Sequence, residues 1–250
     1  MNKWIIGWSA LLLTVASTWG QPSAVDVRTQ EKALLTWRDP HPWQAGVVYT
    51  RVMRPVKLNE VTCDLKADIV DAAVSVAPFG WLVIYGQVGA SRAELDKWMQ
   101  DGASFGAGGL LGVLLNLWEI DAGETASAWR FTMQLAGQYA YRTADDDGDG
   151  KLQWGEAMVM LPLNYHLFFS SPSRNTYSDE FTSLNLYAGP AFSKVDGEWN
   201  FGGAHTDFEE DQAFGAVVGV DLWLLNNLSF GARTDWFDEM SFRVSMNYRF

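Results

Sequence analysis

The last eleven residues, MSFRVSMNYRF, constrain the fold more than any other stretch of the chain. One set of alternate positions is wholly apolar or aromatic, and the other set is wholly polar. The apolar set is Phe242, Val244, Met246, Tyr248 and Phe250, and the polar set is Ser241, Arg243, Ser245, Asn247 and Arg249. Successive side chains of a β-strand point to opposite faces. The segment is therefore predicted to be a strand with one apolar and one polar face.

The same alternation recurs along most of the chain. It predicts about ten strands, over residues 44–54, 65–77, 81–92, 103–118, 128–142, 153–169, 180–193, 212–224, 228–236 and 240–250. Most of these segments reach the 9–11 residues that a strand needs to cross a membrane. A β-sandwich also alternates, but here the polar face carries many glycines and small residues, as a filled lumen requires. We therefore predict an all-β fold, a closed antiparallel transmembrane β-barrel of ten strands, or of eight if the first two segments are not strands.

The N-terminus indicates export. Residues 1–20 combine one early lysine, an apolar run and small residues before Gly20, which is the layout of a secretory signal peptide. The apolar run is short for a spanning helix. Residues 21–43 are then expected to be a periplasmic lead-in, and residues 44–250 the barrel.

Charge and cysteine content exclude two further classes. The formal net charge is -12, which argues against nucleic acid as a partner, because nucleic-acid binding needs a basic surface. Cys63 is the only cysteine, so the exported chain has no internal disulfide.

The most explicit motif is DDDGDGKLQWGE, residues 145–156. Its spacing matches an EF-hand calcium loop, with Gly150 at the sharp turn. The expected Ca2+ ligands are Asp145, Asp147, Asp149, Lys151 through its carbonyl, Gln153 through water, and Glu156 with two oxygens. The flanking segments alternate with period two, so we expect a loop site between strands rather than a helix–loop–helix. The alternative is an acidic surface loop that matches by composition.

The three histidines offer little for catalysis. His41 precedes the barrel, His166 is expected to face the lumen in a structural role, and His205 lies near Asp207 in an expected outer loop. No nucleophile or oxyanion arrangement accompanies them. We therefore expect that the chain is not an enzyme. The alternatives are an enzyme acting on lipid A or peptides, and a narrow channel.

The tryptophans fit two aromatic belts at the edges of a membrane. Trp81, Trp118 and Trp129 are expected at the periplasmic strand ends, and Trp154 and Trp236 at the opposite ends.

The alternating strands and the aromatic C-terminus resemble the small outer-membrane β-barrel proteins of Gram-negative bacteria. The most specific element is the last strand, where Phe250 ends the chain and shares a face with Tyr248 and Phe242. The resemblance implies a location in the cell outer membrane, contact with its lipids, and recognition of Phe250 by the barrel-assembly machinery. It implies no activity. The expected function is a structural or surface-interaction role with a calcium-binding outer loop.

Overall fold

The computed structural model describes residues 43–58, 61–95, 105–122, 127–145, 150–169, 183–224 and 227–250. These ranges hold twelve β-strands, which are β1 (Trp43–Leu58), β2 (Val61–Phe79), β3 (Leu82–Leu95), β4 (Phe105–Ala122), β5 (Ser127–Asp145), β6 (Lys151–Met160), β7 (Leu163–Phe169), β8 (Ser183–Phe201), β9 (Ala204–Glu210), β10 (Phe214–Leu224), β11 (Leu228–Phe237) and β12 (Glu239–Arg249). Within the same ranges, no helix is long and apolar enough to span a membrane. The predicted signal peptide and lead-in lie outside the described residues, except Trp43, the last residue of the predicted lead-in, which begins β1.

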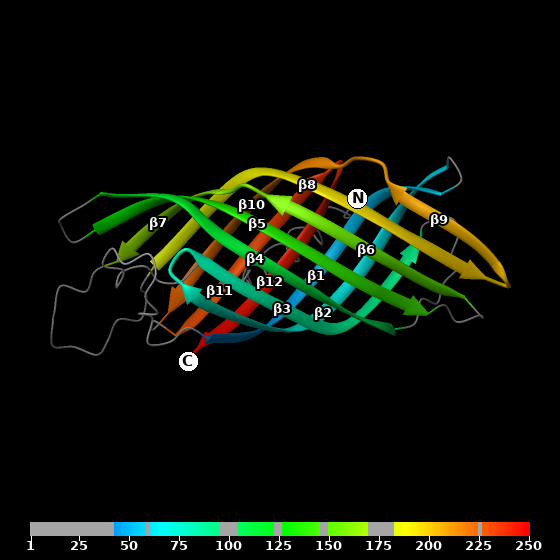
Figure 1. Ribbon diagram of the computed structural model, residues 1–250, viewed down its shortest axis with the longest axis horizontal. Helices are drawn as coiled ribbons and strands as arrows, with labels where there is room; N and C mark the ends of the chain where they lie inside the picture. Colours follow the sequence, from blue (N-terminus) through cyan, green and yellow to red (C-terminus); the bar gives the residue numbers. More distant parts are fainter. Residues whose placement is uncertain are drawn as a thin grey trace, which may run out of the picture.

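The strands form one closed antiparallel barrel (Figure 1). Each strand pairs with its neighbours around the sheet until β12 pairs with β1. β6 and β7 occupy a single position, because both pair with β5 and with β8. The break between them falls at Pro162, which has no N–H to donate to the ladder. β9 and β10 likewise follow one another along β8, so the barrel has ten strand positions, as the sequence predicts.

One end of the barrel is closed differently from the other. Along most of its length β1 is bonded to β12, from Gln44 to Arg51. Farther along, Val56–Leu58 of β1 is bonded instead to Phe208–Glu210 of β9. The β11–β12 hairpin turns back at Asp238, which has a φ of 72°, so β9 passes over it to reach β1. We call the end that contains β9 the distal section.

The exterior of the barrel divides into an apolar band and a charged rim. Outward-facing residues of the band are apolar and exposed, including Val47, Val74, Val88, Leu111, Val159, Phe192, Phe214, Val218 and Phe242. Toward the distal section the outward positions become charged, and Arg51, Asp68, Lys194 and Asp196 are all about half exposed or more. An apolar band of this kind is the exterior of a transmembrane barrel.

The interior also changes along the barrel. Inside the apolar band it holds the predicted polar side chains, with Arg142 paired to Asp71 at 2.6 Å and Arg233 paired to Asp235 at 2.7 Å, beside two smaller apolar clusters around Tyr85 and Tyr187. Inside the distal section it is an apolar core that includes Val56, Leu58, Cys63, Leu65, Leu95, Leu152, Trp154, Val195 and Phe208. The expectation that Trp154 belongs to an aromatic belt is wrong. It is 2% exposed, because it lies on the inward face of β6 and fills this core.

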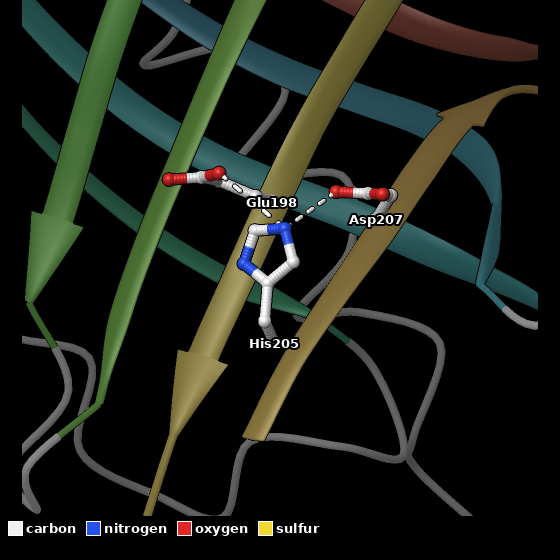
Figure 2. A group of neighbouring side chains, drawn as sticks. All are labelled: Glu198, His205 and Asp207. Atoms are coloured by element: carbon white, nitrogen blue, oxygen red, sulfur yellow. Dashed lines mark ion pairs between the residues drawn. The ribbon is translucent and has the colours of Figure 1, made fainter. Parts of the chain in front are cut away.

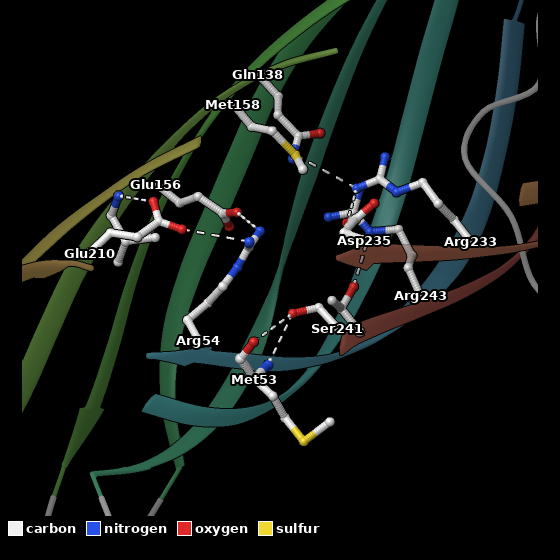
Figure 3. A network of polar contacts seen from close by, with 12 residues as sticks. Met53, Arg54, Gln138, Glu156, Met158, Glu210, Arg233, Asp235, Ser241 and Arg243 are labelled. Atoms are coloured by element: carbon white, nitrogen blue, oxygen red, sulfur yellow. Dashed lines mark hydrogen bonds and ion pairs between the residues drawn. The ribbon is translucent and has the colours of Figure 1, made fainter. Parts of the chain in front are cut away.

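Arg54 marks the boundary between the two interiors (Figure 3). Its guanidinium lies 3.1 Å from Glu156 of β6 and 3.5 Å from Glu210 of β9. It also lies 3.7 Å from the centroid of the Phe237 ring, at the end of β11. Arg54 thus ties β1, β6, β9 and β11 together where the strand pairing changes.

The C-terminal strand is as the sequence predicts. The five polar residues from Ser241 to Arg249 are buried inside the barrel, and Phe242, Met246, Tyr248 and Phe250 are exposed outside it. The backbone N–H of Phe250 donates to the carbonyl of Trp43 at 3.1 Å, which closes the ladder at the chain end. Recognition of Phe250 by an assembly machinery stays a prediction.

Candidate metal centre

The site lies on the β8–β9 hairpin, whose turn determines which side chains face one another. Gly202 and Gly203 form a two-residue turn with φ values of 58° and 85°. Turns with positive φ at both central positions match the twist of the flanking strands and favour glycine. The resulting register sets Asn200 opposite His205.

Two strand positions farther from the turn, Glu198 lies opposite Asp207. Because alternate residues of a strand share a face, Glu198, Asn200, His205 and Asp207 all lie on the exterior of the hairpin.

The Glu198 and Asp207 side chains converge on one imidazole nitrogen of His205 (Figure 2). His205 Nε2 lies 3.0 Å from Asp207 Oδ1 and 3.7 Å from Glu198 Oε2. His205 Nδ1 lies 2.8 Å from Asn200 Oδ1. An amide oxygen only accepts hydrogen bonds, so Nδ1 is the donor to Asn200. Nε2 then donates to the carboxylates when the ring is protonated, and its lone pair is available to a cation when the ring is neutral.

Neighbouring amides hold the Glu198 carboxylate in place. Gln153 Nε2 donates to Glu198 Oε1 at 3.1 Å, and Asn200 Nδ2 donates to the same oxygen at 3.3 Å. The remaining oxygen, Oε2, faces His205. The side chains of Glu198, His205 and Asp207 are 39%, 54% and 81% exposed, so the cluster is open to solutes outside the barrel.

The His205 nitrogen lies at a distance from each carboxylate oxygen that a small cation could bridge, and all three donor atoms lie within 4.8 Å of one another. Tetrahedral Zn2+ with nitrogen and oxygen ligands at about 2.0–2.2 Å separates its ligand atoms by roughly 3.3 Å. The observed separations of 3.0 and 3.7 Å lie on either side of that value. Three protein ligands leave a coordination position for water or for another molecule.

A groove of about 730 Å³ adjoins the cluster. It is lined by Lys57, Tyr139, Tyr141, Gln153, Trp154, Gly155, Asp196, Gly197, Glu198, Asp207, Phe208 and Glu209. Its floor is Gly155, where a Cβ atom would lie 2.8 Å from the Tyr139 hydroxyl. Of its charged residues four are acidic and only Lys57 is basic. A hydrogen bond from Lys57 to Asp211 raises the pKa of the lysine and keeps it charged.

Of the four described residues predicted to bind calcium, three lie on the outer face of the β5–β6 pair and Glu156 lies on the inner face. Asp145 ends β5 and is paired with Lys151, the first residue of β6. Asp147 and Asp149 lie outside the described residues. Gln153 faces the exterior, where it contacts Tyr141 and Glu198.

Glu156 faces the interior and is bound to Arg54. Residues 151–156 are extended, which places Glu156 about 17 Å along the strand from Lys151. The expectation that Glu156 closes a twelve-residue loop around the ion is therefore corrected, because the residue belongs to a strand and lies on the inner wall.

The described histidines behave differently from each other. His166 is 7% exposed inside the barrel and lies 3.2 Å from the Thr132 hydroxyl, as a structural lumen residue should. His205 and Asp207 lie side by side, as the sequence suggests, but Glu198 does not emerge from the sequence reading. The signal that would have found it is NFGGAH. A two-residue Gly–Gly turn in that stretch sets Glu198 opposite Asp207.

Known proteins that resemble this chain are found by structure and not by sequence. No protein-family model matches the chain, and no curated protein sequence does. Among solved structures, the outer membrane protease OmpT from Escherichia coli matches with a TM-score of 0.43 and 11% identity, over 87% of this chain and all of that one. A porin from Rh. blastica matches with a TM-score of 0.15 and 10% identity, over 83% of this chain and 99% of that one.

One expectation is corrected by this comparison. The sequence predicted that the chain is not an enzyme, yet a solved barrel similar to it is a protease. The similarity extends to the fold and does not transfer that activity. The chain has the fold of an outer-membrane β-barrel, all-β, closed and antiparallel, with ten strand positions.

Proposed function

We propose that this chain is an outer-membrane β-barrel protein that binds a divalent transition-metal ion on the exterior of its distal section. The ligands are Glu198, His205 and Asp207. The observation that carries the proposal is the direction of His205 Nε2, which faces two carboxylate oxygens at 3.0 and 3.7 Å while Asn200 holds the other ring nitrogen. The apolar exterior band supports a location in the outer membrane.

The ligand set favours zinc-like ions over calcium. Calcium takes six to eight oxygen ligands, whereas imidazole suits zinc, copper and nickel. Metal-binding histidines usually donate their other ring N–H to a carboxylate, a carbonyl or water, which fixes the tautomer. Asn200 supplies such an acceptor. Binding on the exposed wall of the barrel fits the expected surface-interaction role, because partners outside the cell can reach the open coordination position.

Calcium binding at the β5–β6 turn is a separate proposal. It rests on Asp145, Asp147 and Asp149 only, and Glu156 takes no part in it. A turn with three carboxylates and no bidentate glutamate would hold calcium more weakly than a complete EF-hand loop.

The proposal is tested by calorimetric titration of the folded, detergent-solubilised barrel with Zn2+. We expect one ion for each chain, and His205→Ala should weaken binding by at least about tenfold, because a neutral nitrogen ligand is lost. Glu94→Gln, which removes an exposed carboxylate from β3 on another part of the wall, is the matched control and should bind as the parent does. No Zn2+ binding, or equal affinities for all three proteins, would contradict the proposal.

A further inference from the structure

The exterior of β8 shows an ordered change of chemistry as it leaves the apolar band. Its successive outward residues are Phe192, Lys194 and Asp196, which are all exposed. Alternate residues of a strand lie about 7 Å apart. Along this line an apolar, a cationic and an anionic position therefore follow one another at regular intervals.

The neighbouring positions are apolar beside Phe192, and the one on β6 is small and uncharged beside Lys194. At the level of Phe192 the partners are Val159 and Phe214, which are apolar and exposed. At the level of Lys194 the partner is Ala157, a small residue that leaves the lysine uncovered. The change of chemistry is thus a property of this part of the wall and not of β8 alone.

At the level of Asp196 the wall becomes acidic and hollow. The partner on one side is Gly155, which forms the floor of the groove, and the partner on the other side is Glu209. Tyr141 is paired with Gly155, and the Tyr139 hydroxyl lies over Gly155. Carboxylates and tyrosine rings both attract an ammonium group.

The two nearby lysines do not fill this position. Lys194 Nζ lies 3.6 Å from Asp196, but both side chains are about two-thirds exposed, and exposed ion pairs of this kind contribute little. Lys57, on the far side of Glu209, is held by Asp211. The groove therefore keeps a net negative charge beside an exposed lysine and an apolar wall.

We propose that this surface binds the headgroup of an amine-bearing phospholipid of the phosphoethanolamine type. The ammonium lies in the groove against Asp196 and Glu209, between Tyr139 and Tyr141, and the phosphate lies at Lys194. The acyl chains follow the apolar exterior at Val159, Phe192 and Phe214. A lipid is the occupant, rather than a soluble amine, because the groove opens on the outer wall and only the level of Lys194 and Ala157 separates it from the apolar band.

The inference is independent of the proposed metal. Asp196, Glu209 and Lys194 are not metal ligands. A metal at the cluster would neutralise Glu198 and Asp207, which lie on the side of the groove farther from the apolar band, and would leave the ammonium position unchanged.

The test is native mass spectrometry of the full-length, folded barrel, incubated in detergent and EDTA with equal amounts of phosphatidylethanolamine and phosphatidylglycerol. We expect at least a threefold preference for phosphatidylethanolamine in the parent protein. The double variant Asp196→Asn/Glu209→Gln should lose the preference, and Lys194→Gln should retain less of both lipids. Glu94→Gln is the control and should behave as the parent protein.

A second comparison needs no variant. Acetylation of the lipid amine removes its charge without changing the chains, and we expect the acetylated lipid to be retained no better than phosphatidylglycerol. Equal retention of all three lipids, or a preference that survives in the double variant, would overturn the proposal. Displacement of the lipid by an equal concentration of soluble phosphoethanolamine would also overturn it, because the ligand would then be a free amine.

Discussion

Arg54 is the residue on which the distal closure depends most. Its guanidinium is almost fully buried, and it faces two acidic side chains from different strands, Glu156 and Glu210. Removing one partner of a buried ion pair leaves an uncompensated charge and commonly costs about 3–5 kcal/mol. We expect Arg54→Met to lower the free energy of unfolding by that amount in urea titration of the barrel.

The matched control for this change is Arg51→Met. Arg51 lies on the exterior of the same strand, with about half of its side chain exposed. Its removal should change the free energy of unfolding by less than about 0.5 kcal/mol. Equal effects of the two substitutions would contradict the role of Arg54.

Glu210 should make stability depend on pH. Burial raises the pKa of its carboxyl above the usual value, although Arg54 opposes the shift. The folded state then holds the carboxyl proton of Glu210 more tightly than the unfolded state does. Its contribution to the free energy of unfolding is therefore present at low pH. That contribution is lost as pH rises from the usual glutamate pKa through the raised pKa of the folded state. The free energy of unfolding of the parent protein should fall over that interval.

Glu210→Gln should remove that part of the decrease. The measurement is a series of urea titrations between pH 4 and pH 8. An unchanged pH profile in the variant would show that another group is responsible.

At the scale of elements, the β8–β9 hairpin is the feature that creates the site. Gly203 has a φ of 85°, and a side chain in the left-handed region costs roughly 1–2 kcal/mol. We expect Gly203→Val to disturb the register of Glu198, His205 and Asp207, and so to weaken Zn2+ binding although no ligand is changed. Gly137→Ala is the control, since a Cβ atom there meets nothing within 4 Å, and calorimetry should show parental affinity for it. Parental affinity in Gly203→Val would contradict the dependence on the turn.

The β5–β6 pair allows a test between two interpretations of the acidic motif, a strand with Glu156 facing inward and an EF-hand loop with Glu156 as a ligand. Glu156→Gln should leave any calcium affinity of the acidic segment unchanged, because this side chain lies inside the barrel at Arg54. In an EF-hand loop the same substitution removes the bidentate ligand and weakens binding strongly. Calcium titration of the parent protein and of Glu156→Gln decides between them, and a large loss in the variant would contradict the strand placement.

The two hairpins show why some elements were predictable and others were not. Period-two alternation predicts all ten strand positions, because the alternation of inward and outward residues depends on each strand's own sequence and not on its partner strands. The same alternation runs through Lys151, Leu152, Gln153 and Trp154, and it predicts a strand there. The EF-hand spacing instead predicts a loop with Glu156 as a calcium ligand, and that prediction is wrong. β9 was missed because its residues AHTDFEE are mostly polar, and it is held by pairing with β1, which lies about 150 residues earlier in the chain.

At the scale of the whole molecule, side chains fill the interior of the barrel, so the outer wall is the surface on which we propose binding sites. Among the described residues, the membrane section is filled by polar side chains, some of them joined in ion pairs, together with two apolar clusters around Tyr85 and Tyr187, and the distal section is filled by an apolar core. The sequence predicted the polar interior but not the apolar one, since it gave no sign that the distal strands close over the β11–β12 hairpin. The metal cluster and the groove both lie on the outer wall of the barrel, beyond the apolar band.

The most direct test of the proposed metal centre is X-ray absorption spectroscopy of the folded barrel loaded with one equivalent of Zn2+. The predicted first shell contains one imidazole nitrogen and carboxylate oxygens at about 2.0–2.2 Å, and the imidazole signal should disappear in His205→Ala. A shell made only of oxygen, with the same spectrum in His205→Ala, would place the ion elsewhere and contradict the account.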